Sequence, residues 1–209
     1  SALEALAAYG ESAANPSLGG RVSVPGEVAE LLFDSNADVR YVACLALANF
    51  GATAQAFFGE VFRLLKSETQ SKSVARAAAE ATICLARHTI AAAEDGSCLP
   101  KGEQATPAAL AVAALHERLG SPDPRMRRVV AIGFGELGMA TTEGMPTKSA
   151  QLFEAATVVL GLLKDPEIQV REAALIALGR IARAGWCASS EQAAMIIQAI
   201  REPLLRQQA

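Results

Sequence analysis

Apolar positions recur along this 209-residue chain with the period of an α-helix, inside a pattern that occurs four times. Each copy is anchored on an arginine, with one apolar or small residue directly before it and others three, six, seven and ten positions after it. Residues at these spacings share one face of an α-helix. Because a repeated helix of this kind cannot bury its apolar face alone, it must stack on its neighbours, which predicts a solenoid of helices. The four anchors are Arg40, Arg76, Arg127 and Arg171.

A second amphipathic segment precedes each anchored helix, and a short polar turn joins the two. Two of these turns contain Asp-Pro, at Asp123-Pro124 and Asp165-Pro166, which offers a side-chain acceptor at the N-cap and a fixed φ at the first helical residue. We therefore expect a helix to start at each of them. The preceding segments cover residues 25–33, 54–66, 107–119 and 148–164, and a further one covers 190–206.

The last copy, Asp165 to Gly179, contains Asp-Pro, then Val-Arg, then small and apolar residues at the spacings given above. It resembles the HEAT repeat family in its short Asp-Pro-x-x-x-Val-Arg form. The resemblance implies an all-α fold, namely a right-handed α-solenoid of stacked antiparallel helix pairs of the HEAT and armadillo type.

The same resemblance implies a ladder of ion pairs between acids of the turns and the anchor arginines. The second copy departs from the family pattern, since its turn has no Asp and Ala75 stands in place of Val. The acids that the resemblance assigns to the ladder are Asp34 or Asp38, Asp123 and Asp165.

The repeats extend over the whole chain, so we expect residues 1–209 to form a single array. Two loops, 91–106 and 139–147, absorb the variation in repeat length. The first ten residues match the end of the first full copy, so we expect a partial repeat at 1–10 and a fragment of a longer solenoid. The predicted repeats cover about 25–51, 53–88, 106–138 and 147–184, followed by a closing helix at 190–206.

The charge of the chain disfavours two classes of partner. The net charge is −3 at pH 7, and the sequence contains no run of Lys or Arg. Nucleic acids and phosphate-rich membrane surfaces attract concentrated positive charge, so we expect no nucleic-acid partner. The longest uncharged apolar run, 155–163, is far shorter than the roughly 20 residues that cross a bilayer, so we expect no membrane insertion.

The four cysteines, Cys44, Cys84, Cys98 and Cys187, include no Cys-x-x-Cys pair. Cys44 and Cys84 lie in alanine-rich helical segments, where a free thiol packs as a small apolar group. This usage is typical of a reducing compartment, so we expect an intracellular, cytoplasmic protein. Cys98 lies in a polar loop and is the thiol that we expect to be exposed and reactive.

The segment from Val129 to Gly138 contains Gly-x-Gly-x-x-Gly after a short apolar run, as in dinucleotide-binding turns. The segment aligns with three copies that lack its first two glycines, and residues 141–146 interrupt the helix that should follow it. We therefore attribute Gly133 and Gly135 to close helix approach or a local kink, and we predict no cofactor.

His116-Glu117 is the only His-Glu dipeptide of the chain, whereas HEAT-type metalloenzymes bind two metal ions through several such pairs. With His88 as the only other histidine, such a site lacks ligands, so we expect a solvated pair, no metal site and no enzyme. Phycobilin lyases also use the short HEAT form. An enzyme or cofactor-handling protein on this scaffold therefore stays open as an alternative.

The polar face of the anchored helices is the candidate binding surface. In HEAT arrays this face lines the concave groove, and mixed charge with one aromatic residue suits a protein or peptide partner. We expect a scaffold or adaptor segment of a larger chain or complex, which binds a protein along the groove or at the inter-helix loops. An ordinary solvated face and a structural spacer in a large assembly are the alternatives. The candidate groove residues are Tyr41, Asn49, Glu80, Arg128, Glu136, Glu172 and Arg180.

Overall fold

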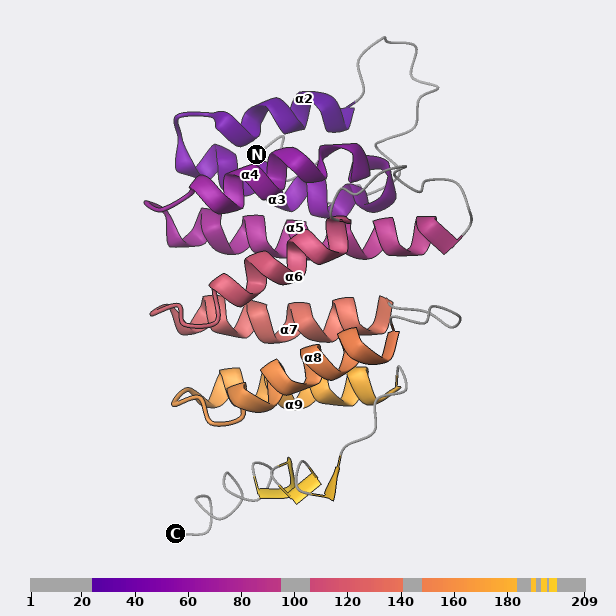
Figure 1. Ribbon diagram of the computed structural model, residues 1–209. Coiled ribbons are helices and arrows are strands. Elements are labelled where there is room, and N and C mark those ends of the chain that lie inside the picture. Colours follow the sequence, from indigo (N-terminus) through magenta and orange to yellow (C-terminus); the bar gives the residue numbers. More distant parts are fainter. Residues whose placement is uncertain are drawn as a thin grey trace. The chain divides into compact units, whose positions relative to one another are not determined.

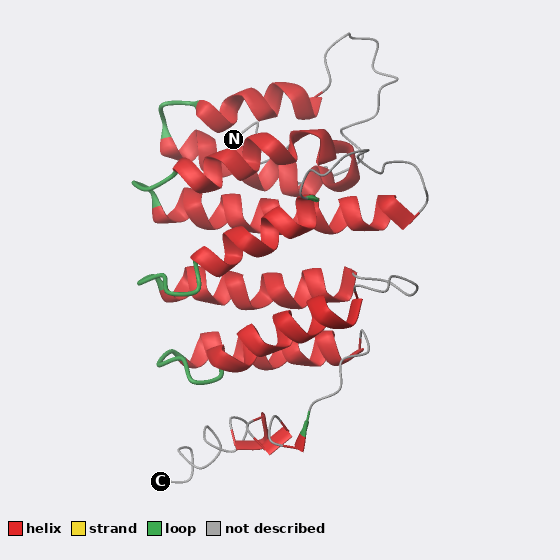
Figure 2. Cartoon of the chain, viewed as in Figure 1, coloured by secondary structure: helices red, strands yellow, loops and turns green. Residues whose placement is uncertain are grey.

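The computed structural model describes residues 24–94, 106–140 and 148–183, together with Ser189, Ser190 and five residues between 193 and 198. Over these residues the chain is helical, and the described part contains no strand (Figures 1 and 2). The predicted all-α class is confirmed. The elements are α2 (Val24–Glu30), η2 (Leu31–Phe33), α3 (Ala37–Phe50), η3 (Gly51–Phe57), α4 (Phe58–Ser67), α5 (Lys72–Glu94), α6 (Pro107–Glu117), α7 (Pro124–Ala140), α8 (Lys148–Leu162) and α9 (Ile168–Arg183).

The chain divides into two compact units, residues 1–115 and 116–209. In the first unit α3 and α4 both pack on α5. In the second unit α7 packs along α9, and α8 packs on both. Figure 1 shows α8 running opposite to α9, as expected for an antiparallel helix pair. The prediction of one array over 1–209 and its repeat boundaries stay predictions, and the partial repeat at 1–10 lies outside the described residues.

The anchored helices are α3, α5, α7 and α9, and they bury the face that the repeat pattern predicts. Seven positions after each anchor stands a large apolar residue, and all four of these are buried. Phe50 and Phe134 are the largest fully buried side chains of the described core. The four buried residues at the seventh position are Leu47, Ile83, Phe134 and Leu178.

The turns start the anchored helices largely as expected. Asp123 Oδ1 accepts a hydrogen bond from the Arg125 N–H at 3.1 Å, and α7 begins at Pro124. After Asp165-Pro166, however, α9 begins two residues later than predicted, at Ile168, because the Asp165 carboxylate holds a turn through the Glu167 N–H at 2.9 Å. At the other end of α3, Gly51 has a φ of 56° and ends the helix where glycine was expected to.

Several predicted boundaries differ from the observed ones, and the segments expected at 107–119 and 148–164 end at Glu117 and Leu162. Residues 54–57, expected in an amphipathic α-helix, belong to the 3-10 helix η3. The expected loops are also shorter, since α5 continues to Glu94 and α7 to Ala140. The closing helix at 190–206 lies mostly outside the described residues.

One described stretch, Ala37–Ser67, has the length (31 residues) and mean hydropathy (1.4) of a segment that could cross a membrane. It is divided into α3, η3 and α4, and the longest of these has 14 residues, against the roughly 20 that a span requires. Its apolar side chains, among them Leu47 and Val61, are buried in the first unit. Core helices of soluble proteins pass the same test, so this stretch is weak support for a membrane span.

Candidate functional site

The anchor arginines bind the turns, and Arg127 shows the arrangement most completely. Its Nε and Nη2 donate to the two carboxylate oxygens of Asp165 at 2.6 and 2.9 Å, and its Nη1 donates to the carbonyl of Ser121 at 2.7 Å. Asp165 is only 9% exposed. The hydrogen bond from Arg127 holds the pKa of the Asp165 carboxyl below its usual value. This ion pair ties α7 to the turn before α9, as the HEAT resemblance implied.

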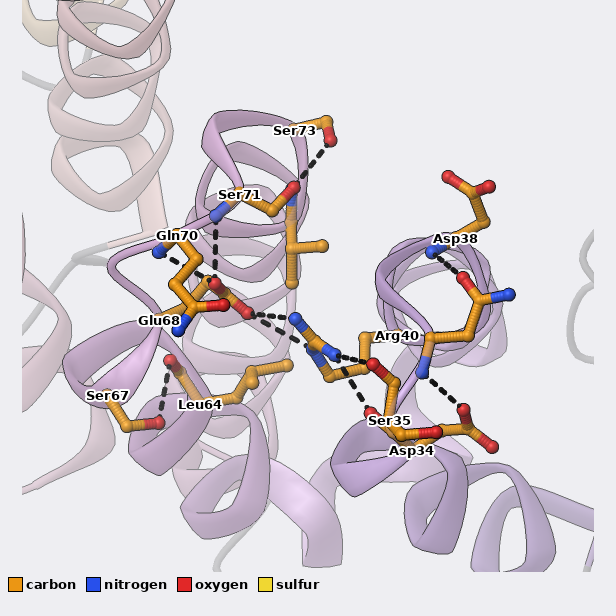
Figure 3. A network of polar contacts seen from close by, with 12 residues as sticks. Asp34, Ser35, Asp38, Arg40, Leu64, Ser67, Glu68, Gln70, Ser71 and Ser73 are labelled. Carbon is orange, nitrogen blue, oxygen red and sulfur yellow. Dashed lines mark hydrogen bonds and ion pairs between the residues drawn. The ribbon is translucent and has the colours of Figure 1, made fainter.

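Arg40 makes the same kind of contact in the first unit, but its acid is Glu68 (Figure 3). Arg40 Nε and Nη2 donate to Glu68 Oε2 at 3.1 and 2.8 Å, and Nη1 donates to the carbonyls of Asp34 and Ser35. Glu68 replaces the Asp that this turn lacks. The aspartates assigned to this rung from the family pattern, Asp34 or Asp38, do not supply the carboxylate, because Arg40 reaches across to the turn before α5.

The Glu68 carboxylate is buried, and both of its oxygens accept hydrogen bonds. Its Oε1 accepts the N–H groups of Gln70 and Ser71 at 3.1 and 2.9 Å, which shapes the turn before α5. Burial raises the pKa of the Glu68 carboxyl, but the hydrogen bonds from Ser71, Arg40 and Gln70 outweigh burial and hold that pKa below its usual value. The ion pairs of Arg40 with Glu68 and of Arg127 with Asp165 are thus structural, as expected for the ladder. The rung implied for Arg76 stays a prediction.

The candidate binding site is an open hollow of about 390 Å³ between α7 and α9 in the second unit. Three of the predicted groove residues line it: Arg128, Glu172 and Arg180. A fourth, Glu136, accepts a short hydrogen bond from Arg180 Nη1 and so forms an ion pair across the two helices. The remaining lining residues are Ile132, Gln169, Ala173 and Ile176.

The two helices present matching stripes to the hollow. On α7, Arg128, Ile132 and Glu136 follow one another at intervals of four residues, which places them on one face. On α9 the same intervals carry Glu172, Ile176 and Arg180. The two stripes therefore have the orders basic–apolar–acidic and acidic–apolar–basic. Two isoleucines lie between two pairs of opposite charges.

Sequence reasoning found the charged members of these stripes and missed Ile132, Gln169 and Ile176. Ile176 is 59% exposed, the largest exposure among the large apolar residues that the structure describes. The sequence does contain a signal for the isoleucines. Ile132 and Ile176 stand five residues after Arg127 and Arg171, midway between the charged residues predicted to line the groove. The fifth position lies outside the apolar face that the repeat pattern defines, so that no role was predicted for the isoleucines there.

The other three candidates lie in the first unit. Tyr41 and Asn49 are exposed on α3, with Tyr41 at 37%, and Glu80 is exposed on α5. On α5 the first and fifth positions after the anchor, which carry the stripes on α7 and α9, are Ala77 and Ala81, and both are buried. The exposed Glu80 stands at the fourth position, so the exposed face of α5 begins one residue earlier relative to its anchor. The seven candidates therefore fall into two sets, one in each unit.

The glycine-rich segment 129–138 is helical and lies within α7, which contradicts the strand that a dinucleotide fingerprint needs. A Cβ placed on Gly135 would lie 2.8 Å from Ala177 Cα and 2.9 Å from Ala177 Cβ. Gly135 therefore permits close packing of α7 on α9, as predicted. The close approach or kink predicted at Gly133 stays a prediction.

His116 departs from the predicted solvated pair. Its ring is half-buried and packs edge-on against the ring of Phe134, with centroids 5.2 Å apart, whereas Glu117 is exposed. The aromatic neighbour makes His116 part of the packing in the second unit. Among the described residues no group of three or more His, Cys, Asp or Glu side chains could hold a metal ion.

The two described cysteines behave as the sequence suggested. Cys44 is buried, and desolvation raises the pKa of its thiol to about 12. Cys84 Sγ donates to the Ala48 carbonyl at 3.2 Å, across the contact between α5 and α3. Cys98 and Cys187 lie outside the described residues, so the exposure expected for Cys98 stays a prediction.

The HEAT repeat family model matches residues 157–184, which include the second half of α8, the Asp165 turn and α9. This segment is therefore similar to a HEAT repeat. The resemblance predicted from the sequence is confirmed for this segment, which includes the α9 side of the hollow and the Asp165 rung. No curated protein matches the chain.

The solved structures that are similar to the chain include an engineered protein and a TOG-domain array. An engineered protein shares 23% identity with a TM-score of 0.51, over 76% of this chain and 62% of its own length, so that the chain spans less than two thirds of that protein. The TOG-domain array of crescerin, which regulates microtubules in the primary cilium, shares 19% identity with a TM-score of 0.44, over 95% of this chain and 76% of its own. The first likeness supports the helical fold alone, and the second is too distant to add to it.

Proposed function

We propose that this chain is a protein-interaction scaffold that binds a segment of another protein in the hollow between α7 and α9. The observation that carries the proposal is the apolar stripe of half-buried Ile132 and exposed Ile176, which lies between opposite charges in the hollow. HEAT repeats are, as a family, surfaces for protein partners rather than enclosed catalytic pockets.

Of the four charged residues beside the isoleucines, two form an ion pair with each other and two do not. Glu136 and Arg180 neutralise each other across the helices. The side chains of Arg128 and Glu172, which also line the hollow, make no hydrogen bond or ion pair with any residue that the structure describes. Both charges are therefore available to an acidic and a basic group of a bound segment, while a large apolar side chain of that segment covers the isoleucines.

The shape of the hollow favours binding over chemistry. A volume of about 390 Å³ accommodates a few side chains, but the hollow is partly open to solvent. Catalytic sites depend on excluding water around the reacting groups, which an open surface does poorly. The described lining also contains no Cys, His or Ser that could act as a nucleophile or metal ligand.

The test is comparative capture of partners by two variants of the full-length protein. Ile176→Asp places a charge in the centre of the hollow. Ile168→Asp places the same charge on the same helix, at a residue that is 45% exposed and does not line the hollow. Both variants should keep the melting temperature of the wild type, because both side chains are exposed.

The proposal expects a protein that is bound by the wild type and by Ile168→Asp and lost with Ile176→Asp. Such a protein should then bind the purified chain directly, with an affinity about 10-fold or more weaker for Ile176→Asp, the usual effect of losing a central apolar contact. Equal binding of all three proteins would exclude the hollow as the binding surface.

We also propose that the protein resides in a reducing intracellular compartment. The buried thiol of Cys44 and the hydrogen-bonded thiol of Cys84 support this location, since neither forms a disulfide and both lie in the packing between helices. Alkylation inside intact cells before lysis tests it, and a disulfide found at either cysteine would contradict it.

A further inference from the structure

The two stripes that border the hollow carry their charges in a two-fold symmetric order. Arg127 near the start of α7 contacts Asp165 in the turn before α9, and Glu136 farther along α7 pairs with Arg180 farther along α9. The two helices therefore run in the same direction. At the start of the stripes a basic residue of α7 stands opposite an acidic residue of α9, and at the end the two signs are exchanged. A half-turn about the centre of the hollow thus leaves the pattern of charge unchanged.

The unpaired charges lie at one end of this pattern. Glu136 and Arg180 bind each other, whereas the side chains of Arg128 and Glu172 make no hydrogen bond or ion pair within the described part of the chain. Arg128 and Glu172 are both exposed. They stand at the same level of the two helices, since each lies eight residues before a member of the ion pair. This end of the hollow therefore presents one positive and one negative charge side by side.

The two isoleucines between the charges differ in how far they project. Ile176 is 59% exposed, whereas Ile132 is half-buried. A projecting apolar side chain thus stands beside a recessed one, and both line the hollow. A partner covers the pair best if it offers a recess for Ile176 and a projecting apolar side chain for Ile132.

A second copy of this chain meets each of these requirements. The two copies are placed face to face, related by a half-turn about an axis that runs along the helices between α7 and α9. Arg128 of each copy then faces Glu172 of the other, so that both unpaired charges of each molecule find a partner. The same half-turn places the exposed Ile176 of each copy over the recessed Ile132 of the other. The projecting side chains thereby enter the two hollows, each of about 390 Å³.

The other two-fold arrangement, with the axis across the helices, satisfies less of the surface. It would place Arg128 and Glu172 against the residues that already form the ion pair. It would also bring the two exposed Ile176 side chains against each other and leave the recessed isoleucines uncovered. The axis along the helices therefore accounts for both the charges and the apolar contacts.

We infer that the surface of α7 and α9 is a self-association site, at which a second copy of this chain binds about an axis along the helices. The contact is isologous, the commonest form of association between identical chains. The inference rests on the proposed function, since it concerns the same hollow and names the protein that enters it as another molecule of this chain. The stripes supply far fewer than the roughly 20–30 residues a side of a standard interface, so the association is reversible and depends on concentration.

Charge reversal in the purified full-length protein tests the inference. Arg128→Glu and Glu172→Arg each create two like-charge contacts in the symmetric dimer, so each variant alone should self-associate about 10-fold or more weakly than the wild type. An equal mixture of the two variants should recover the dimer. In the mixed dimer the new carboxylate of one variant faces the new guanidinium of the other, and the unchanged Glu172 faces the unchanged Arg128. The axis across the helices predicts no such recovery.

Sedimentation velocity over the micromolar range measures the association of each variant and of the mixture. Arg125→Glu is the matched control, because it makes the same change of charge on α7 at an exposed residue that does not line the hollow. This control should associate like the wild type. Melting temperatures of all variants should agree, since the changed side chains are exposed.

The inference is wrong if the wild type stays monomeric over this range, if the charge variants associate like Arg125→Glu, or if their mixture fails to recover the dimer. The capture comparison of Ile176→Asp with Ile168→Asp separates this failure from that of the proposed function. A monomeric chain that loses a foreign protein with Ile176→Asp alone refutes self-association and leaves the hollow as a binding surface. A chain whose capture and association are both unchanged by Ile176→Asp refutes the two proposals together.

Discussion

Gly135 on α7 lies directly against Ala177 on α9, so closely that a Cβ on Gly135 would approach Ala177 Cα to 2.8 Å. Helix packing at such short range requires a residue without a side chain on one side. The contact also sets the distance between the two stripes of the hollow. Gly135 directly precedes Glu136 of one stripe, and Ala177 directly follows Ile176 of the other.

Gly135→Ala should therefore destabilise the protein by about 1–3 kcal/mol, the cost of overpacking a close contact. The backbone of Ala177 cannot move aside as a flexible side chain would. Gly179→Ala is the matched control on α9, because its Cβ would meet nothing within 4 Å. This control should gain up to about 1 kcal/mol from the higher helix propensity of alanine. Urea unfolding of both variants measures the difference, and equal stabilities would show that α7 and α9 are not in close contact.

Phe134→Ala should lower the free energy of unfolding by about 3–5 kcal/mol. The side chain is 1% exposed and also packs against the His116 ring, so its loss leaves a cavity in the second unit. Ile132→Ala, on the same helix but lining the open hollow, should cost much less. Chemical denaturation checks both values, and comparable losses would mean that Ile132 is a core residue and does not belong to the hollow.

The sequence predicted the helical repeat, the buried face and the close approach at Gly135, because periodicity of apolar residues reports burial directly. It did not predict Glu68 as the partner of Arg40, because a glutamate at another position of the turn reaches the same guanidinium through its longer side chain. It also missed the isoleucines of the hollow. Both isoleucines are at the fifth position after the anchor, outside the periodic apolar face, and only the structure shows that Ile176 lines a hollow between charges and is largely exposed.

Acid should destabilise the protein through Asp165 and Glu68. The pKa values of both carboxyls are lowered in the folded state, so they contribute stability that is fully present above their unfolded pKa values of about 3.9 and 4.3 and is lost as the pH falls through the folded values. The free energy of unfolding should therefore fall from about pH 5 downward. Asp165→Asn with Glu68→Gln should be less stable at pH 7 and should show a shallower decline below pH 5. A decline as steep as that of the wild type would assign the acid sensitivity to other groups.

Cys44 should resist thiol reagents in the native protein. Burial raises the pKa of its thiol to about 12, so that at pH 8 almost none of it is the reactive thiolate. The same burial keeps the reagent from reaching the sulfur. Intact-mass analysis after iodoacetamide treatment should show no label on Cys44 until denaturant is added. Rapid native labelling of Cys44 would indicate that the contact between α3 and α5 opens readily.

The measurement that tests the proposed role most directly combines stability and binding on one pair of variants. Arg128→Glu with Ile176→Asp alters only the hollow, whereas Arg127→Met removes the neighbouring guanidinium that binds Asp165. Melting temperature and retention of the captured protein partner are measured for both. The hollow variant should melt like the wild type and lose the partner, while Arg127→Met should melt several degrees lower. A hollow variant that keeps the partner, or that unfolds as readily as Arg127→Met, would contradict a binding surface between α7 and α9.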